Sequence, residues 1–96
     1  MGLFNKNKQA GISDEELITR YRFSHDNEYI GELYKRYTHL VFGVCMKYLK
    51  DPAKAEDATM QIFEKLIEDL KKFEVDYFKG WLHMVARNHC LMKLRK

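Results

Sequence analysis

The sequence has 96 residues and a net charge of +3, with 46% hydrophobic and 32% charged residues. This length allows one domain with a single modest core, and the apolar content excludes a disordered chain. One proline and five glycines are too few for a turn-rich β fold, so the composition favours helices. No apolar run is long enough to span a membrane, and the polar start of the chain does not fit a signal peptide.

Residues 1–12 are predicted to form a loose, slightly basic arm, followed by a helical domain over residues 13–96. The first helix is expected to begin at a capping box. In that motif the Ser13 hydroxyl accepts from the amide three residues on, and the Glu16 side chain reaches back. The helix is predicted to end near Phe23. Its apolar face consists of Leu17, Ile18 and Tyr21.

A second, longer helix is expected to follow Asp26, which suits an N-cap position. Its apolar residues step by three and four, which is one stripe of an α-helix. This stripe consists of Ile30, Leu33, Tyr34, Tyr37, Val41, Val44, Tyr48 and Leu49.

A third helix is predicted from about Pro52 to Lys72, with Asp51 as its cap and proline at the first helical position. The predicted buried stripe is Ala55, Ala58, Ile62, Leu66, Ile67, Leu70 and Phe73. The opposite, polar face carries Asp57, Gln61, Glu64, Lys65 and Glu68.

A short loop over residues 73–76 is expected next, with Asp76 able to cap a fourth helix over residues 77–96. Gly80 inside this helix costs about 1 kcal/mol relative to alanine, which fits a close backbone approach or a loose first turn. The helix contains no Asp or Glu. Its bases are Lys79, Arg87, Lys93, Arg95 and Lys96, with His83 and His89 among them. Such a helix is a candidate nucleic-acid reader, and the alternative is a solvated basic face.

The four helices predict a compact all-α bundle. Residues 51–76 hold eight acids against four bases, whereas the segment that follows holds five bases and no acid. Neighbouring acidic and basic segments indicate two different partner surfaces.

The chemistry-bearing residues do not form a catalytic or metal-binding pattern. Cys45 and Cys90 lie in helical patterns without a CxxC pair, so we expect reduced core thiols in a cytosolic protein. The four histidines do not have the spacing of a helical metal site, and no phosphate-binding loop or nucleophile elbow is present. The sequence therefore predicts no catalytic residue, no metal and no cofactor.

Two stretches of the sequence stand out as motifs. The first is Ala55-Glu56-Asp57 followed by Phe63, and the second is FKGWLHMVARN over residues 78–88. Together they resemble region 2 of bacterial RNA polymerase sigma factors of the extracytoplasmic-function group. The family pattern is close to A-E-D-x-x-Q-E-x-F and then W-L-x-x-I-A-R-N. The resemblance runs over residues 15–96. It implies the all-α sigma region 2 fold, a function in promoter recognition and opening, and a place in the bacterial cytoplasm.

The resemblance also implies that the third helix binds RNA polymerase core through the clamp coiled coil of the largest subunit. The matching residues here are Asp57, Met60, Gln61 and Phe63, with Glu64 as a neighbour. Met60 stands where the pattern has Gln, and Gln61 stands where it has Glu. Core binding is then expected to depend more on apolar contact. For Met60 and Phe63 the alternative is packing in the core.

The fourth helix and the loop before it correspond to the part of the family that reads the promoter −10 element on the non-template strand. The loop over residues 72–79 would form a pocket for a flipped base, with rings from Phe73, Tyr77 or Phe78. Trp81 is expected to pack in the core, with base stacking as the alternative. Asn88 can pair with an adenine edge, Arg87 can grip phosphate or form an internal ion pair, and the lysines position the backbone. The predicted DNA-binding residues are Lys72, Tyr77, Lys79, His83, Arg87, Asn88, Lys93 and Arg95, with Lys96 as a further phosphate contact.

Sigma factors of this group also have a C-terminal helix-turn-helix domain for the −35 element, which these residues do not encode. We therefore expect a domain of a longer chain, with a natural short form as the alternative. An anti-sigma factor is an expected partner. The competing functional hypotheses are a helical protein-interaction or anti-sigma-like adaptor domain that binds no DNA and, less favoured, a metal-dependent helical enzyme.

Overall fold

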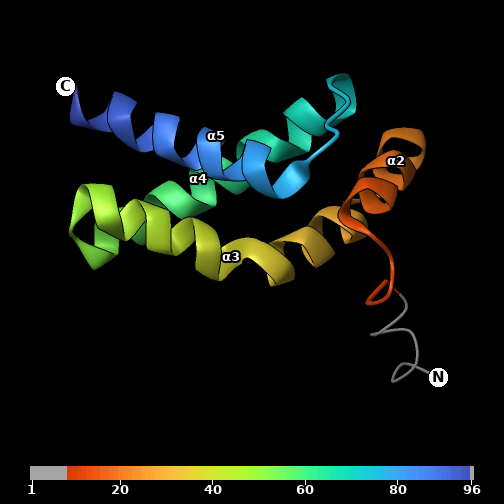
Figure 1. The fold of residues 1–96 in the computed structure, drawn as a ribbon, viewed down its shortest axis with the longest axis horizontal. Helices are drawn as coiled ribbons and strands as arrows, with labels where there is room; N and C mark the ends of the chain where they lie inside the picture. The colour runs from red at the N-terminus through yellow and green to blue at the C-terminus, as the bar shows by residue number, and fades with distance from the viewer. Residues whose placement is uncertain (1–8, 96) are drawn as a thin grey trace.

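The computed structural model describes residues 9–95, which form four α-helices and no strand (Figure 1). The helices are α2 (Asp14–Ser24), α3 (Asn27–Leu49), α4 (Pro52–Lys72) and α5 (Phe78–Leu94). Helices α3, α4 and α5 run along the longest dimension of the molecule, and α2 packs against the beginning of α3 and the end of α4. The predicted all-α bundle is confirmed. Residues 1–8 of the expected arm and Lys96 lie outside the described residues.

Three of the four predicted N-caps are confirmed because their side chains bind the amides that a helix leaves unpaired, whereas the fourth, Asp76, lies outside the N-cap position of its helix. Ser13, Asp26 and Asp51 accept hydrogen bonds from the amides of Glu16, Glu28 and Ala53 at 3.1, 2.9 and 2.9 Å, respectively. The reciprocal half of the predicted capping box is not formed. The Glu16 carboxylate instead pairs with Arg20 at 3.0 Å, one turn along α2.

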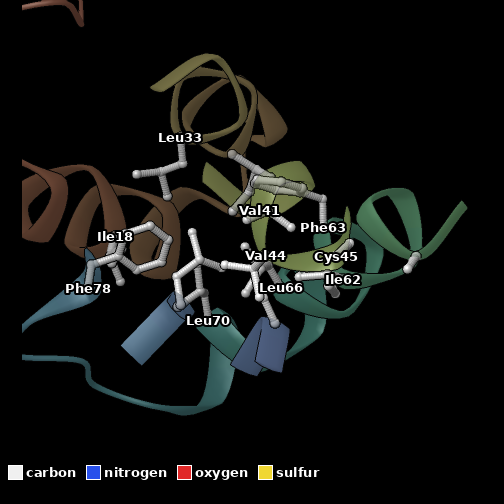
Figure 2. Close-up of a cluster of buried hydrophobic side chains, with 14 of the residues drawn as sticks. Ile18, Leu33, Val41, Val44, Cys45, Ile62, Phe63, Leu66, Leu70 and Phe78 are labelled. Carbon is white, nitrogen blue, oxygen red and sulfur yellow. The ribbon is translucent and has the colours of Figure 1, made fainter. Parts of the chain in front are cut away.

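The core lies where the apolar stripes of the four helices meet (Figure 2). Helix α2 contributes Ile18, α3 contributes Leu33 and Val41, and α5 contributes Phe78. Along α4 the buried side chains are Ala55, Ala58, Thr59, Ile62, Phe63, Leu66 and Leu70. Burial of such stripes supplies most of the stability of helices of this length.

Two residues of the predicted stripes are exposed. Phe73 is 54% exposed, so its assignment to the core is wrong. The helix ends at Lys72, and the extended backbone of Phe73 (φ −113°, ψ 138°) turns its side chain off the helical stripe. Tyr34 is 43% exposed and packs only an edge against Phe63, with ring centroids 4.9 Å apart. Periodicity could not predict the exposure of these two residues. It identifies the apolar face of a helix but not which residues of that face lie at the edge of the core.

The two cysteines are buried and free, as predicted. Cys45 on α3 and Cys90 on α5 bring their thiols together in the core. Burial, and then the contact with Cys45, raises the pKa of the Cys90 thiol. Such a thiol carries little thiolate at neutral pH and is a packing group.

A polar cluster around Arg36 on α3 holds the beginning of α2 in place. The Arg36 guanidinium donates to Asp14 at 2.9 Å, to Glu32 at 3.0 Å and to the backbone carbonyl of Gln9 at 2.8 Å. The Tyr37 hydroxyl donates to the second carboxylate oxygen of Asp14. The planar guanidinium thereby connects the segment before α2, the first turn of α2 and α3 itself.

Candidate nucleic-acid interface

The outer face of α5 carries a line of three exposed side chains. Lys79, His83 and Arg87 follow one another at intervals of four residues, which places them on one side of the helix. The helix contains no acidic residue, and none of the ion pairs among residues 9–95 involves Lys79 or Arg87. These cations are therefore free to attract phosphate groups rather than being neutralised within the domain.

Three further residues of the predicted DNA-binding set lie along the remainder of α5 and at its end. Asn88, Lys93 and Arg95 are all exposed. In the part of the chain that the structure describes, no hydrogen bond engages the Asn88 amide, so both its donor and its acceptor face solvent. An amide with both functions free can pair bidentately with an adenine edge.

The segment between α4 and α5 presents two exposed rings beside a cation. Lys72 is exposed, Phe73 is 54% exposed and Tyr77 is 68% exposed. The Tyr77 ring lies against the backbone of Gly80, because a Cβ atom added at Gly80 would come within 2.7 Å of two carbons of that ring. This is the close backbone approach that the glycine suggested. An exposed ring supported on one side suits the stacking of an unpaired base.

Phe78 does not share this exposure. Its side chain is fully buried, with ring centroids 5.4 Å from Tyr37 and 6.0 Å from Trp81. The expectation that Phe78 contributes a ring to a base pocket is therefore wrong. The half-buried Trp81 packs against the core, which agrees with its predicted role.

The five predicted polymerase-binding residues occupy the side of α4 that faces away from the centre of the bundle, with one exception. Asp57, Met60 and Glu64 are exposed, and Gln61 is half-buried. Phe63 is only 6% exposed and belongs to the core. The alternative of core packing therefore applies to Phe63 and not to Met60, which is 56% exposed.

A shallow apolar groove runs between α3 and α4. Tyr34, Met60, Phe63 and Ile67 line it, with Glu64 at its edge. An exposed apolar groove beside acidic side chains is a feature of protein interaction sites. Tyr34 was not among the predicted site residues, because its position in the stripe of α3 indicated core packing.

The family profile described as Sigma-70 region 2 matches residues 33–96, which is 64 of the 96 residues. This chain belongs to the sigma-70 region 2 family. Searches of curated proteins and of solved structures gave no match. Sigma region 2 domains act in transcription initiation by binding RNA polymerase and recognising the promoter −10 element, so this is a transcription initiation factor domain. The matched segment contains α4 and α5 entirely, but it leaves out α2.

In this sigma region 2 domain, a chain of hydrogen bonds connects α4 to α5. The Gln61 amide nitrogen donates to Asp57 at 3.2 Å, which turns its oxygen towards His89 at 3.1 Å. Because that oxygen can only accept, the Nε2 atom of His89 must carry a proton. His89 follows Asn88 directly, so these hydrogen bonds connect the predicted polymerase-binding face of α4 to α5, the predicted DNA-binding helix. The sequence did not reveal this role, since His89 was assigned only to a basic stretch.

The environment of His89 favours its neutral form. Burial, followed by the charges of Lys93 and Lys65, lowers the pKa of His89 below its ordinary value of 6.5. The unfolded chain then binds a proton more readily than the folded domain does. The contribution of His89 to the free energy of unfolding is therefore fully present above a pH of about 6.5. It is lost as the pH falls from there towards the lowered pKa of His89 in the folded domain.

We therefore expect the melting temperature of the wild-type domain to fall as the pH is lowered from about 7.5 to about 5.5, and to fall less in His89→Gln. Thermal denaturation followed by circular dichroism across this range measures the difference. His83→Gln on the exposed face of α5 is the matched control and should keep the wild-type pH profile. Equal pH slopes for wild type and His89→Gln would contradict the assigned role of His89.

No helix among residues 9–95 is long and apolar enough to cross a membrane. Within the same residues, no group of three or more His, Cys, Asp or Glu side chains is placed to hold a metal ion. The features that the described residues do offer are the acid-free face of α5, the aromatic segment before it and the groove beside α4.

Proposed function

We propose that this domain acts in a bacterial sigma factor of the extracytoplasmic-function group and reads the −10 element as single-stranded DNA. The non-template strand runs along α5, where Lys79, His83, Lys93 and Arg95 contact phosphates and Lys72 extends the path. Arg87 and Asn88 meet the upstream edge of the element, and an unpaired base stacks on Tyr77. The observation that supports this assignment best is the exposed, acid-free line of cations that begins at a supported aromatic ring.

The proposed polymerase contact lies on α4 and its groove. Asp57, Gln61 and Glu64 provide a polar, acidic surface, and Met60 provides apolar contact at the groove, which the core residue Phe63 also lines. The partner proposed for this surface is the clamp coiled coil of the largest polymerase subunit. We further propose that the protein acts in the bacterial cytoplasm and that an anti-sigma factor controls it.

The test is fluorescence anisotropy with a labelled single-stranded −10-like oligonucleotide pool at two salt concentrations, beside binding to the isolated clamp coiled coil. We expect salt-sensitive DNA binding, because neutralising phosphates releases counterions. Arg87→Ala should weaken binding and reduce the salt slope by about one. Asn88→Ala should reduce discrimination at one base position by about 1–3 kcal/mol.

Lys35→Ala is the matched control for loss of a single charge, since Lys35 is an exposed lysine on α3. It should retain DNA binding, and all three variants should retain binding to the coiled coil. If neither Arg87→Ala nor Asn88→Ala changed the affinity for DNA, α5 could not be the helix that recognises the −10 element. Coiled-coil binding without any salt-dependent DNA binding would favour an adaptor that contacts only proteins.

A further inference from the structure

Helix α5 differs from the other helices in how its first turn is capped. Tyr77 occupies its N-cap position and its side chain makes no capping hydrogen bond; no acidic residue follows in the first turn. Asp76, which the sequence suggested as a cap, lies outside the N-cap position. The helix would thus begin with unpaired amides unless another element supplied an acceptor.

The acceptor is Glu15, which lies on α2 and is 63 residues away in the chain. The backbone amide of Phe78 donates to the Glu15 carboxylate at 3.2 Å. A carboxylate at this position also interacts favourably with the positive end of the α5 dipole. One side chain of α2 therefore fixes the residue at which the proposed reading helix starts.

The turn of α2 that carries Glu15 is anchored by the neighbouring residues. The preceding residue, Asp14, is bound by the Arg36 guanidinium at 2.9 Å and by the Tyr37 hydroxyl, both of α3. Ser13 caps the same turn of α2. The carboxylate that reaches Phe78 thus projects from a turn that α3 anchors from the other side.

The residue that this contact fixes most directly is Tyr77, next to Phe78. The Phe78 ring is locked in the core, and the Tyr77 carbonyl accepts from the Trp81 amide at 3.1 Å, which makes the first turn of α5. The Tyr77 ring rests on Gly80 while most of its surface remains exposed. The peptide group between Tyr77 and Phe78 is therefore held at both its carbonyl and its amide, and the Tyr77 ring can occupy its position only because Gly80 has no side chain.

We propose that Glu15 is a positioning residue for promoter binding. By capping α5 from α2, it holds Tyr77 over Gly80 in the orientation that receives the unpaired base. The inference rests on the proposed function and adds a residue outside the segment that the family profile matches. Glu15 acts through Phe78 and Tyr77 and makes no contact with DNA.

The experiment measures binding of a single-stranded −10-like oligonucleotide and of a series in which each base in turn is replaced by an abasic site. Wild type should show its largest loss at the abasic position whose base stacks on Tyr77. Glu15→Ala should weaken binding of the intact strand about three- to tenfold. The same substitution should weaken binding of that abasic strand much less, because this strand lacks the base whose stacking on Tyr77 the Glu15 side chain supports.

Three further variants separate positioning from general destabilisation. Glu15→Gln keeps an acceptor oxygen and should restore most of the affinity. Glu16→Ala removes an exposed carboxylate of the same turn and should bind as wild type does. Gly80→Ala should raise the melting temperature, since alanine favours helix, and yet weaken binding by displacing the Tyr77 ring.

The outcomes test two claims separately, namely that Glu15 positions Tyr77 and that the domain binds single-stranded DNA. Equal affinities for Glu15→Ala and Glu16→Ala would overturn the positioning role, and so would an equal loss on intact and abasic strands. If wild type binds no strand in a salt-dependent way, the proposed DNA-reading function itself fails. The wild-type measurement therefore distinguishes the failure of the function from the failure of Glu15.

Discussion

Phe78→Ala is expected to destabilise the domain by about 3–5 kcal/mol, which is the usual result of removing a fully buried ring. The Phe78 ring is in contact with Tyr37 and Trp81 and lies among side chains of α2 and α4. Domains of this size are stable by about 5–15 kcal/mol, so a large part of the stability would be lost. Urea denaturation followed by circular dichroism measures the change.

Phe73→Ala is the matched control, because it removes the same ring from an exposed position five residues earlier. Its unfolding free energy should stay within about 0.5 kcal/mol of wild type. If Phe78→Ala were equally mild but abolished DNA binding, the Phe78 ring would belong to the base pocket and not to the core. Comparing the two variants thereby distinguishes the loss of a phenylalanine ring from the core from the loss of the same ring from the surface.

Arg36→Ala should be the second most damaging change, at about 2–4 kcal/mol of unfolding free energy. It would leave the carboxylates of Asp14 and Glu32 without their shared guanidinium, although these side chains are only 16% and 12% exposed. Arg36→Lys should not restore the lost stability. The compact ammonium group of lysine cannot bind two carboxylates and a backbone carbonyl at once, as the planar guanidinium does.

Arg20→Ala is the control for this second change. Arg20 also pairs with a glutamate one turn away, but the two side chains are 44% and 50% exposed. Exposed pairs of this kind contribute about 0–1 kcal/mol, so the chemical denaturation midpoint should hardly move. Comparable losses for Arg20→Ala and Arg36→Ala would show that the Arg36 cluster does not hold α2 to α3.

The features that the sequence predicted correctly are local ones. The N-caps at Ser13, Asp26 and Asp51 and the apolar stripes depend on residues within a turn or two of each other, so spacing is sufficient to find them. The end of α4 shows the limit of this approach. Phe73 continued the apolar spacing, yet the backbone leaves the helix at that residue and exposes the ring.

The features that were missed connect distant parts of the chain. Glu15 and Phe78 are 63 residues apart, and His89 and Gln61 are 28 residues apart. No periodicity or motif connects such residues, and they meet only because the helices pack as they do. The resemblance in α4 and α5 pointed to the partners of the domain, but it could not show that α2 determines how α5 begins.

The position of α2 also affects where such a domain can be trimmed. A fragment limited to the family-matched residues 33–96 would lose Leu17, Ile18 and Tyr21, which are nearly fully buried, together with the first six residues of α3. Apolar side chains of α4 and α5 would become solvent-exposed, and the start of α5 would lose its distant acceptor. We therefore expect the smallest unit that folds by itself to be longer than the segment by which the family is recognised, with its boundary before Ser13.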